Sequence, residues 1–218
     1  MKKHGWFRQV TVCALMVCGV ISLVFAGCAR MPYTTKSVHE DYRVAVTLQQ
    51  ETAPVTYTHP VQLTAEDVTA MLRSFSLREE QRLPLRWFAE EAPPKSVFRE
   101  DELVWVSPYL VDALQQAGPG ERAHFQLFGA GMNRAQTRNV TAGWVAIREP
   151  YLYLTIEYFH NEVPLRHSDT YYPNDPLMPP KPKTYLLFFE PARFWVTDQT
   201  GARALQFRDF LKTAPLSP

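Results

Sequence analysis

Cysteine is nearly absent from this chain of 218 residues. Its three cysteines, Cys13, Cys18 and Cys28, all lie near the start of the chain. The sequence after them therefore offers no disulfide, no cysteine metal ligand and no cysteine nucleophile. Stability has to come from a hydrophobic core, and an aromatic content of 13% supplies large side chains for one.

Common catalytic motifs are missing as well. Gly129-Ala130-Gly131 lacks the third glycine of a dinucleotide-binding loop, which favours a plain loop between strands. There is no G-x-S-x-G serine motif and no H-E-x-x-H zinc motif. The acidic pairs Glu79-Glu80 and Glu90-Glu91 lie in charged segments typical of solvated surfaces, and neither pair is distinguishable as a general acid and base.

The start of the chain, residues 1–27, has the composition of an export signal. Basic side chains open it, an apolar run covers residues 10–25, and the small residues Ala26 and Gly27 stand directly before Cys28.

The segment Phe25-Ala26-Gly27-Cys28 resembles the lipobox of bacterial lipoprotein precursors, although leucine is more usual at the position of Phe25. The resemblance implies cleavage before Cys28, which would then carry a covalent diacylglycerol and an N-acyl chain such as palmitate. One acyl chain binds a membrane only reversibly, so several chains would form a lasting lipid anchor.

Ala29 occupies the position where an aspartate would favour retention in the inner membrane. The resemblance therefore implies a cell-envelope lipoprotein on the outer membrane, facing the periplasm. Two alternatives stay open. The 18 residues from Val10 to Gly27 approach the length of a membrane-spanning helix, and the cleavage site could be an ordinary one. Both alternatives also send residues 29–218 across the membrane.

Charge argues against nucleic acid as a partner. Residues 1–27 hold three of the 23 Lys and Arg and none of the 22 Asp and Glu, which leaves 20 basic against 22 acidic residues, a formal net charge of −2. Nucleic-acid binding needs a clustered basic face. The length suits a signal peptide (1–27), a lipid-anchored tether (28–40) and a single domain (41–218).

One helix is predicted over residues 65–75. Thr64 can cap it by accepting a hydrogen bond from the amide of Asp67, and Leu63 and Val68 occupy the two positions of a hydrophobic staple. A second helix is predicted from a cap at Ser107 to Gly118, with Pro108 at its first position. Alternatively, this helix begins near Asp101 and Pro108 is a kink.

Apolar alternation predicts the strands. In the first, Tyr42, Val44, Val46 and Leu48 share a face. The other predicted strands cover residues 123–128, 140–148, 151–159, 184–189, 194–197 and 205–207. The predicted class is α+β: an antiparallel sheet of about five to six strands packed with two main helices, plus a long proline-rich loop.

A single cluster of metal-ligand residue types follows the strand at 151–159. It consists of His160, Glu162, His167 and Asp169. Imidazole and carboxylate groups suit zinc, but a site needs three or four of them to converge, and ordinary loop residues are the default interpretation. His124 is expected to be a surface or satisfied residue on a strand, and His39 and His59 fall in loops.

Residues 161–183 contain six prolines and are predicted to form a long exposed loop, partly polyproline II. Tyr171, Tyr172, Met178 and Lys181 make this segment a weak candidate for docking an envelope protein partner.

These observations favour a non-enzymatic binding or scaffold protein of the cell envelope, with no cofactor beyond its lipid. The alternatives are a hydrolase or metal-binding protein that uses the 160–169 segment, and a carrier of an apolar ligand.

Overall fold

The computed structural model describes residues 33–80, 93–132, 136–164 and 184–213. The predicted export signal and Cys28 lie outside these residues, so processing and the lipid anchor stay predictions. Among the helices that the structure describes, none combines the length and the apolar composition needed to cross a membrane.

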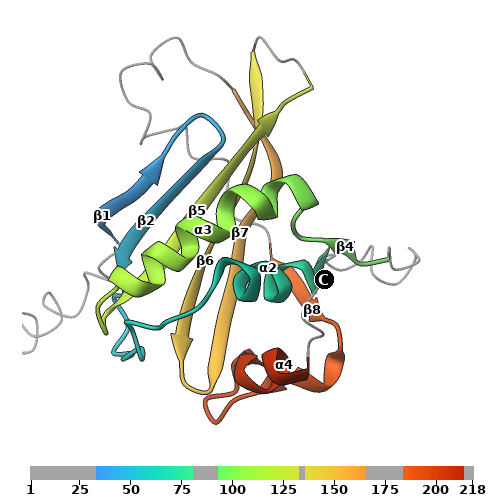
Figure 1. Ribbon diagram of the computed structural model, residues 1–218. Coiled ribbons are helices and arrows are strands. Elements are labelled where there is room, and N and C mark those ends of the chain that lie inside the picture. Colours follow the sequence, from blue (N-terminus) through green and yellow to red (C-terminus); the bar gives the residue numbers. More distant parts are fainter. Residues whose placement is uncertain (1–32, 81–92, 133–135, 165–183, 214–218) are drawn as a thin grey trace, which may run out of the picture. The chain divides into compact units, whose positions relative to one another are not determined.

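Ten strands in two antiparallel sheets dominate the described residues (Figure 1). The large sheet has seven strands in the order β1-β2-β5-β6-β7-β10-β9, and the small sheet has three in the order β4-β3-β8. The strands are Tyr33–Glu40 (β1), Val44–Gln50 (β2), Phe75–Glu79 (β3), Lys95–Ser96 (β4), Glu121–Ala130 (β5), Thr137–Arg148 (β6), Tyr151–Pro164 (β7), Tyr185–Phe189 (β8), Trp195–Thr197 (β9) and Arg203–Gln206 (β10). The predicted α+β class with a single sheet is therefore wrong, because the described chain is mostly β.

The α-helices that accompany these strands are Ala65–Arg73 (α2), Glu100–Gln116 (α3) and Phe207–Thr213 (α4). The predicted start of α2 is confirmed. Thr64 Oγ1 accepts a hydrogen bond from the Asp67 amide at 3.1 Å, and the Asp67 carboxylate accepts one from the Thr64 amide at 3.0 Å. The helix ends before Phe75, which starts β3 and is buried.

Helix α3 begins well before Ser107, so the predicted cap there is wrong and the alternative start near Asp101 is confirmed. A carboxylate oxygen of Glu102 accepts a hydrogen bond from the Arg99 amide at 2.9 Å and caps the first turn. Pro108 lies inside the helix. Because proline has no N–H, the helical hydrogen bond to the carbonyl of Val104 cannot form.

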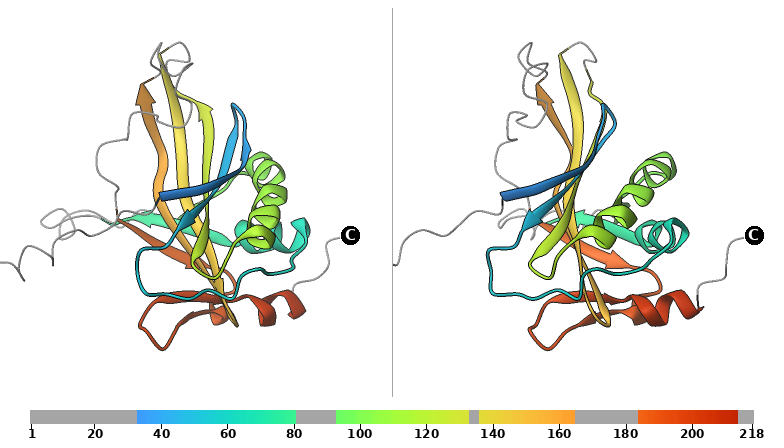
Figure 2. Two further views of the ribbon diagram at one scale, coloured as in Figure 1. Left: turned by 90° about the vertical axis from the view of Figure 1, so that its left-hand side faces the viewer. Right: turned by 60° about the vertical axis from the view of Figure 1, so that its left-hand side comes forward.

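Helices α2 and α3 pack on each other, and α3 lies across β1, β2 and β5 on one face of the large sheet (Figure 2). Strand β2 turns Val44, Val46 and Leu48 into the core between sheet and helix, as its alternation predicts. Tyr42 is the exception, because it precedes the strand and is exposed.

The strand β7 shows the same agreement. Leu152, Leu154, Ile156 and Tyr158, predicted to share a face, are all buried. Strands β6 and β7 approach each other closely at Gly143, where a Cβ atom would meet the backbone oxygen of Thr155 at 2.1 Å.

The predicted tether is wrong for residues 33–40, which form β1 and pair antiparallel with β2. Most side chains of β1 are exposed and polar, so backbone pairing forms this edge strand without an apolar alternation to reveal it. Strands β3 and β4 were not predicted either. They lie on either side of residues 81–92, which are outside the described part, and the charged sequence of this region shows no apolar alternation that would indicate a strand.

Candidate functional site

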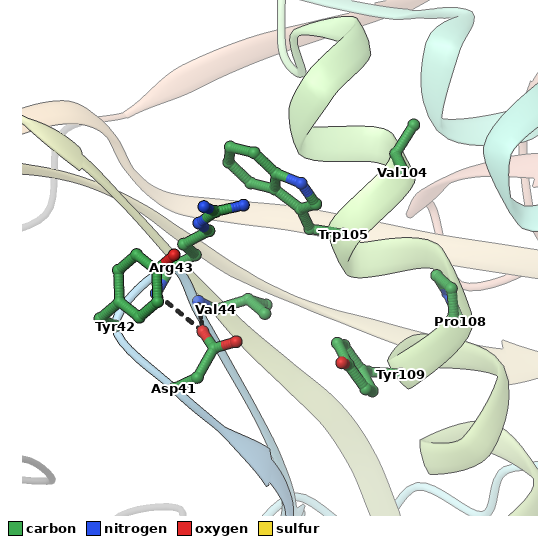
Figure 3. Close-up of a pocket in the computed structure, with 8 residues that line it drawn as sticks. All are labelled: Asp41, Tyr42, Arg43, Val44, Val104, Trp105, Pro108 and Tyr109. Carbon is green, nitrogen blue, oxygen red and sulfur yellow. Dashed lines mark hydrogen bonds between the residues drawn. The ribbon is translucent and has the colours of Figure 1, made fainter.

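A pocket of about 360 Å³ opens between the turn that joins β1 to β2 and the middle of α3 (Figure 3). The turn contributes residues 41–44, and the helix contributes Val104, Trp105, Pro108 and Tyr109. These helix positions are spaced by one and four residues, so they form one strip along the helix surface.

This strip lies beside the face that α3 buries. Leu103, Val106 and Leu110 are fully buried in the core, whereas Trp105 is half-buried and Val104 is 70% exposed. The helix therefore presents one apolar strip to the sheet and directs Trp105 and Tyr109 toward the turn, while Val104 points away from the turn (Figure 3).

The opposite wall is a turn held by Asp41. One of its carboxylate oxygens accepts hydrogen bonds from the amides of Arg43 and Val44, each at 2.7 Å. The amide of Phe128 on β5 donates to the Arg43 carbonyl at 2.8 Å and ties the turn to the sheet. Partial burial alone would raise the pKa of Asp41, but the hydrogen bonds from the two amides and from His39 outweigh it and lower this pKa.

The charged group of the pocket is the guanidinium of Arg43. Its central carbon lies 4.9 Å from the centre of the Tyr42 ring and 4.7 Å from the centre of the Trp105 ring. Figure 3 shows Arg43 between these two side chains. Within the part of the chain that the structure describes, this guanidinium has no carboxylate within ion-pair distance.

The prediction that His39 falls in a loop is wrong, because His39 lies on β1, beside the pocket. Its imidazole stacks on the Tyr109 ring with the ring centres 3.6 Å apart and the planes 5° from parallel, and its Nε2 lies 3.2 Å from the second carboxylate oxygen of Asp41. The β1–β2 hairpin and α3 are thus linked by two contacts to aromatic rings, Arg43 with Trp105 and His39 with Tyr109.

The chemistry of the pocket lining provides apolar contacts and one positive charge for a ligand. The lining contains no serine, threonine or cysteine, and its one carboxylate, on Asp41, is occupied by backbone amides and His39. It offers exposed aromatic and aliphatic surface and one cation, and Tyr42 is 76% exposed at its rim.

The predicted metal cluster is not assembled by the described residues. His160 and Glu162 lie on β7, while His167 and Asp169 lie outside the described part. One carboxylate oxygen of Glu162 accepts from the Met132 amide at 2.9 Å and from the Thr137 hydroxyl at 2.5 Å, which fastens β6 to β7. No three metal-ligand side chains come together within the described ranges.

A polar cluster covers part of the sheet face opposite α3. His124 is buried, and its Nε2 lies 3.1 Å from a carboxylate oxygen of Glu157 on β7, which agrees with the expectation of a satisfied residue. Burial would raise the pKa of Glu157, but His124 and the nearby Arg122 lower it. The Arg122 guanidinium lies over the Trp144 ring at 4.7 Å.

His59 lies in the loop between β2 and α2, as the sequence predicted, and its side chain is buried there. It is 4% exposed, and its Nε2 accepts a hydrogen bond from the Ile147 amide at 2.9 Å. The amide can only donate, so Nδ1 carries the proton and donates to the Glu121 carbonyl at 2.9 Å. Burial lowers the pKa of His59, and the neutral ring joins the 51–64 connection to β5 and β6.

The proline-rich segment proposed for docking, with Tyr171, Tyr172, Met178 and Lys181, also lies outside the described residues. The pocket on α3 was missed by sequence reasoning. A signal was present, because Val104, Trp105 and Tyr109 are large apolar residues that lie outside the buried stripe of a helix.

A scan against family models, a search of curated proteins and a search of solved structures each returned no match.

Proposed function

We propose that this protein is a lipid-anchored lipoprotein of the bacterial cell envelope that binds another envelope component without catalysing a reaction. The lipobox-like segment ending at Cys28 supports the anchor and its place on the periplasmic face of the outer membrane. The pocket formed by residues 41–44 and α3 is the binding surface.

The observation that carries the binding role is the exposed apolar surface of this pocket. Tyr42 and Val104, exposed by 76% and 70%, stand on opposite walls of it. Exposed apolar and aromatic side chains that line one pocket are typical of a binding site. The tyrosine, tryptophan and arginine around it are also the residue types that dominate binding energy at protein interfaces.

Site-directed photo-crosslinking in the native envelope tests this role. A photoreactive amino acid replaces Val104 in the full chain, which is then expressed in its own cell and irradiated. We expect one discrete adduct, and we expect Tyr42→Ala in the same chain to reduce it strongly, because Tyr42 lines the same pocket.

The matched control places the same photoreactive group at Leu186 of β8, which is 40% exposed and lies outside the pocket lining. The same adducts at both positions, or no adduct at Val104, would remove the case for the pocket as the binding surface.

A further inference from the structure

We propose that the pocket binds a peptide segment in which a carboxylate stands next to an apolar side chain, with Arg43 as the partner of the carboxylate. This inference rests on the proposed function, because it specifies the chemistry of the component that the pocket takes.

The contacts that Arg43 makes with Tyr42 and Trp105 leave the N–H donors of its guanidinium available. A guanidinium is planar, so aromatic rings contact its faces while its N–H groups point outward in the plane. Tyr42 and Trp105 are within 5 Å of the guanidinium carbon, at 4.9 and 4.7 Å. Contact with the two rings leaves the N–H donors of Arg43 available, and the fork of donors on a guanidinium matches the two oxygens of a carboxylate.

Asp41, the carboxylate nearest in sequence, does not neutralise Arg43. Its Oδ1 accepts from the amides of Arg43 and Val44, and its Oδ2 faces His39 Nε2. The positive charge of Arg43 is thus left for a ligand, while the negative charge of Asp41 is used to build the turn.

The same arrangement favours a carboxylate over a phosphate. The carboxylate of Asp41 puts negative charge beside the pocket. A phosphate monoester carries close to two negative charges at neutral pH, about twice the charge of a carboxylate, so it meets more repulsion from Asp41.

An apolar group beside the carboxylate would cover the rest of the pocket. Val104 and Tyr42 expose apolar surface on the two walls, and Pro108 lies between Val104 and Tyr109 on the helix strip. A short acidic and apolar peptide supplies both features.

Nuclear magnetic resonance titration of the full lipidated protein, labelled with 15N and held in a non-ionic detergent, tests the inference. The reporter is the indole N–H signal of Trp105, assigned by its loss in Trp105→Phe. The probes are acetyl-Asp-Phe-amide, acetyl-Asn-Phe-amide and acetyl-Asn-Phe with a free terminal carboxylate. The second removes the carboxylate, and the third moves it from a side chain to a chain end.

We expect acetyl-Asp-Phe-amide to bind at least about fivefold more tightly than acetyl-Asn-Phe-amide, because only the former makes a charge-assisted bond to Arg43. Arg43→Gln should abolish this difference, and Arg43→Lys should keep part of it. Tight binding of the free acid would support the same chemistry and identify a chain end as the source. The control is Arg203→Gln, which changes another exposed arginine stacked on a tryptophan, Trp195, at 5.4 Å, and should leave the difference intact.

Equal binding of the aspartyl and asparaginyl probes, or an unchanged difference in Arg43→Gln, would overturn the inference. These outcomes are separable from failure of the proposed function. A crosslinked partner at Val104 combined with equal probe binding refutes only the carboxylate chemistry. Selective probe binding without a crosslinked partner refutes only the binding role.

Discussion

Replacement of His59 by phenylalanine is the most informative perturbation of the fold. The substitution keeps an aromatic ring of similar size but removes both hydrogen bonds, from the Ile147 amide and to the Glu121 carbonyl, each 2.9 Å long. A buried backbone group left without a partner costs about 1 to 3 kcal/mol, so two of them predict a loss of about 2 to 6 kcal/mol in the free energy of unfolding. Urea denaturation of the full protein measures this loss.

The pH dependence of the free energy of unfolding gives a second test of the role of His59. Burial lowers the pKa of His59 from the ordinary value near 6.5, so the folded state resists a proton that the unfolded state accepts. The contribution of His59 is fully present above that value and is lost as pH falls below it, by up to about 1.4 kcal/mol for each pH unit. The pKa of His160 is also lowered by burial, so this histidine adds a slope of the same sign.

Stability of the wild type should therefore fall between pH 7.5 and 5.5, within the window set by an ordinary histidine pKa of about 6.5. The free energy of unfolding should change less steeply with pH in His59→Phe, where only His160 still contributes to this slope. The control, His39→Phe, changes a histidine whose ion pair is partly exposed and should cost less than about 1 kcal/mol. A cost for His59→Phe no larger than that of the control, together with an unchanged slope, would refute the reasoning.

Other substitutions have equally definite expected results. Gly143→Ala should cost about 3 kcal/mol or more in urea denaturation, because the new Cβ would overlap the Thr155 backbone oxygen, whereas Gly129→Ala, whose new Cβ meets nothing closer than 3.8 Å, should stay near wild type. Equal stability of the two variants would contradict the close approach of β6 and β7. Thr64→Ala removes the cap of α2 and should cost about 1 kcal/mol, and no change would mean that the capping box is dispensable.

Sequence patterns predicted the elements whose signals are local. The capping box at Thr64 and Asp67 and the alternation of β2 and β7 follow from near neighbours along the chain, and each was found in the structure. Local signals also explain the error at Phe75. Its spacing continues the stripe of α2, but packing against Phe189 and Trp195 places it in a strand.

Two features without an apolar pattern of their own escaped prediction. Strand β1 has few apolar residues and exists because its backbone pairs with β2. The burial of His59 was missed because its two partners, Glu121 and Ile147, are 62 and 88 residues away in the chain.

The pocket needed two separate pieces to meet, a turn at residues 41–44 and a strip on α3. The turn looked like the start of a strand, with Tyr42 assigned to the core face. The strip was obscured because the helix was expected to begin at Ser107, which left Val104 and Trp105 outside it. Once α3 starts at Glu100, the apolar residues beside its buried stripe become visible.

The proposal of an envelope-anchored binding protein depends most directly on the chemistry of Cys28. Mass spectrometry of the protein extracted from its native membranes tests it. The predicted result is a chain that begins at Cys28, carries a diacylglycerol on the sulfur and an N-acyl chain on the new terminus, and loses both in Cys28→Ser. A chain that retains residues 1–27, or that begins elsewhere with an unmodified Cys28, would contradict it.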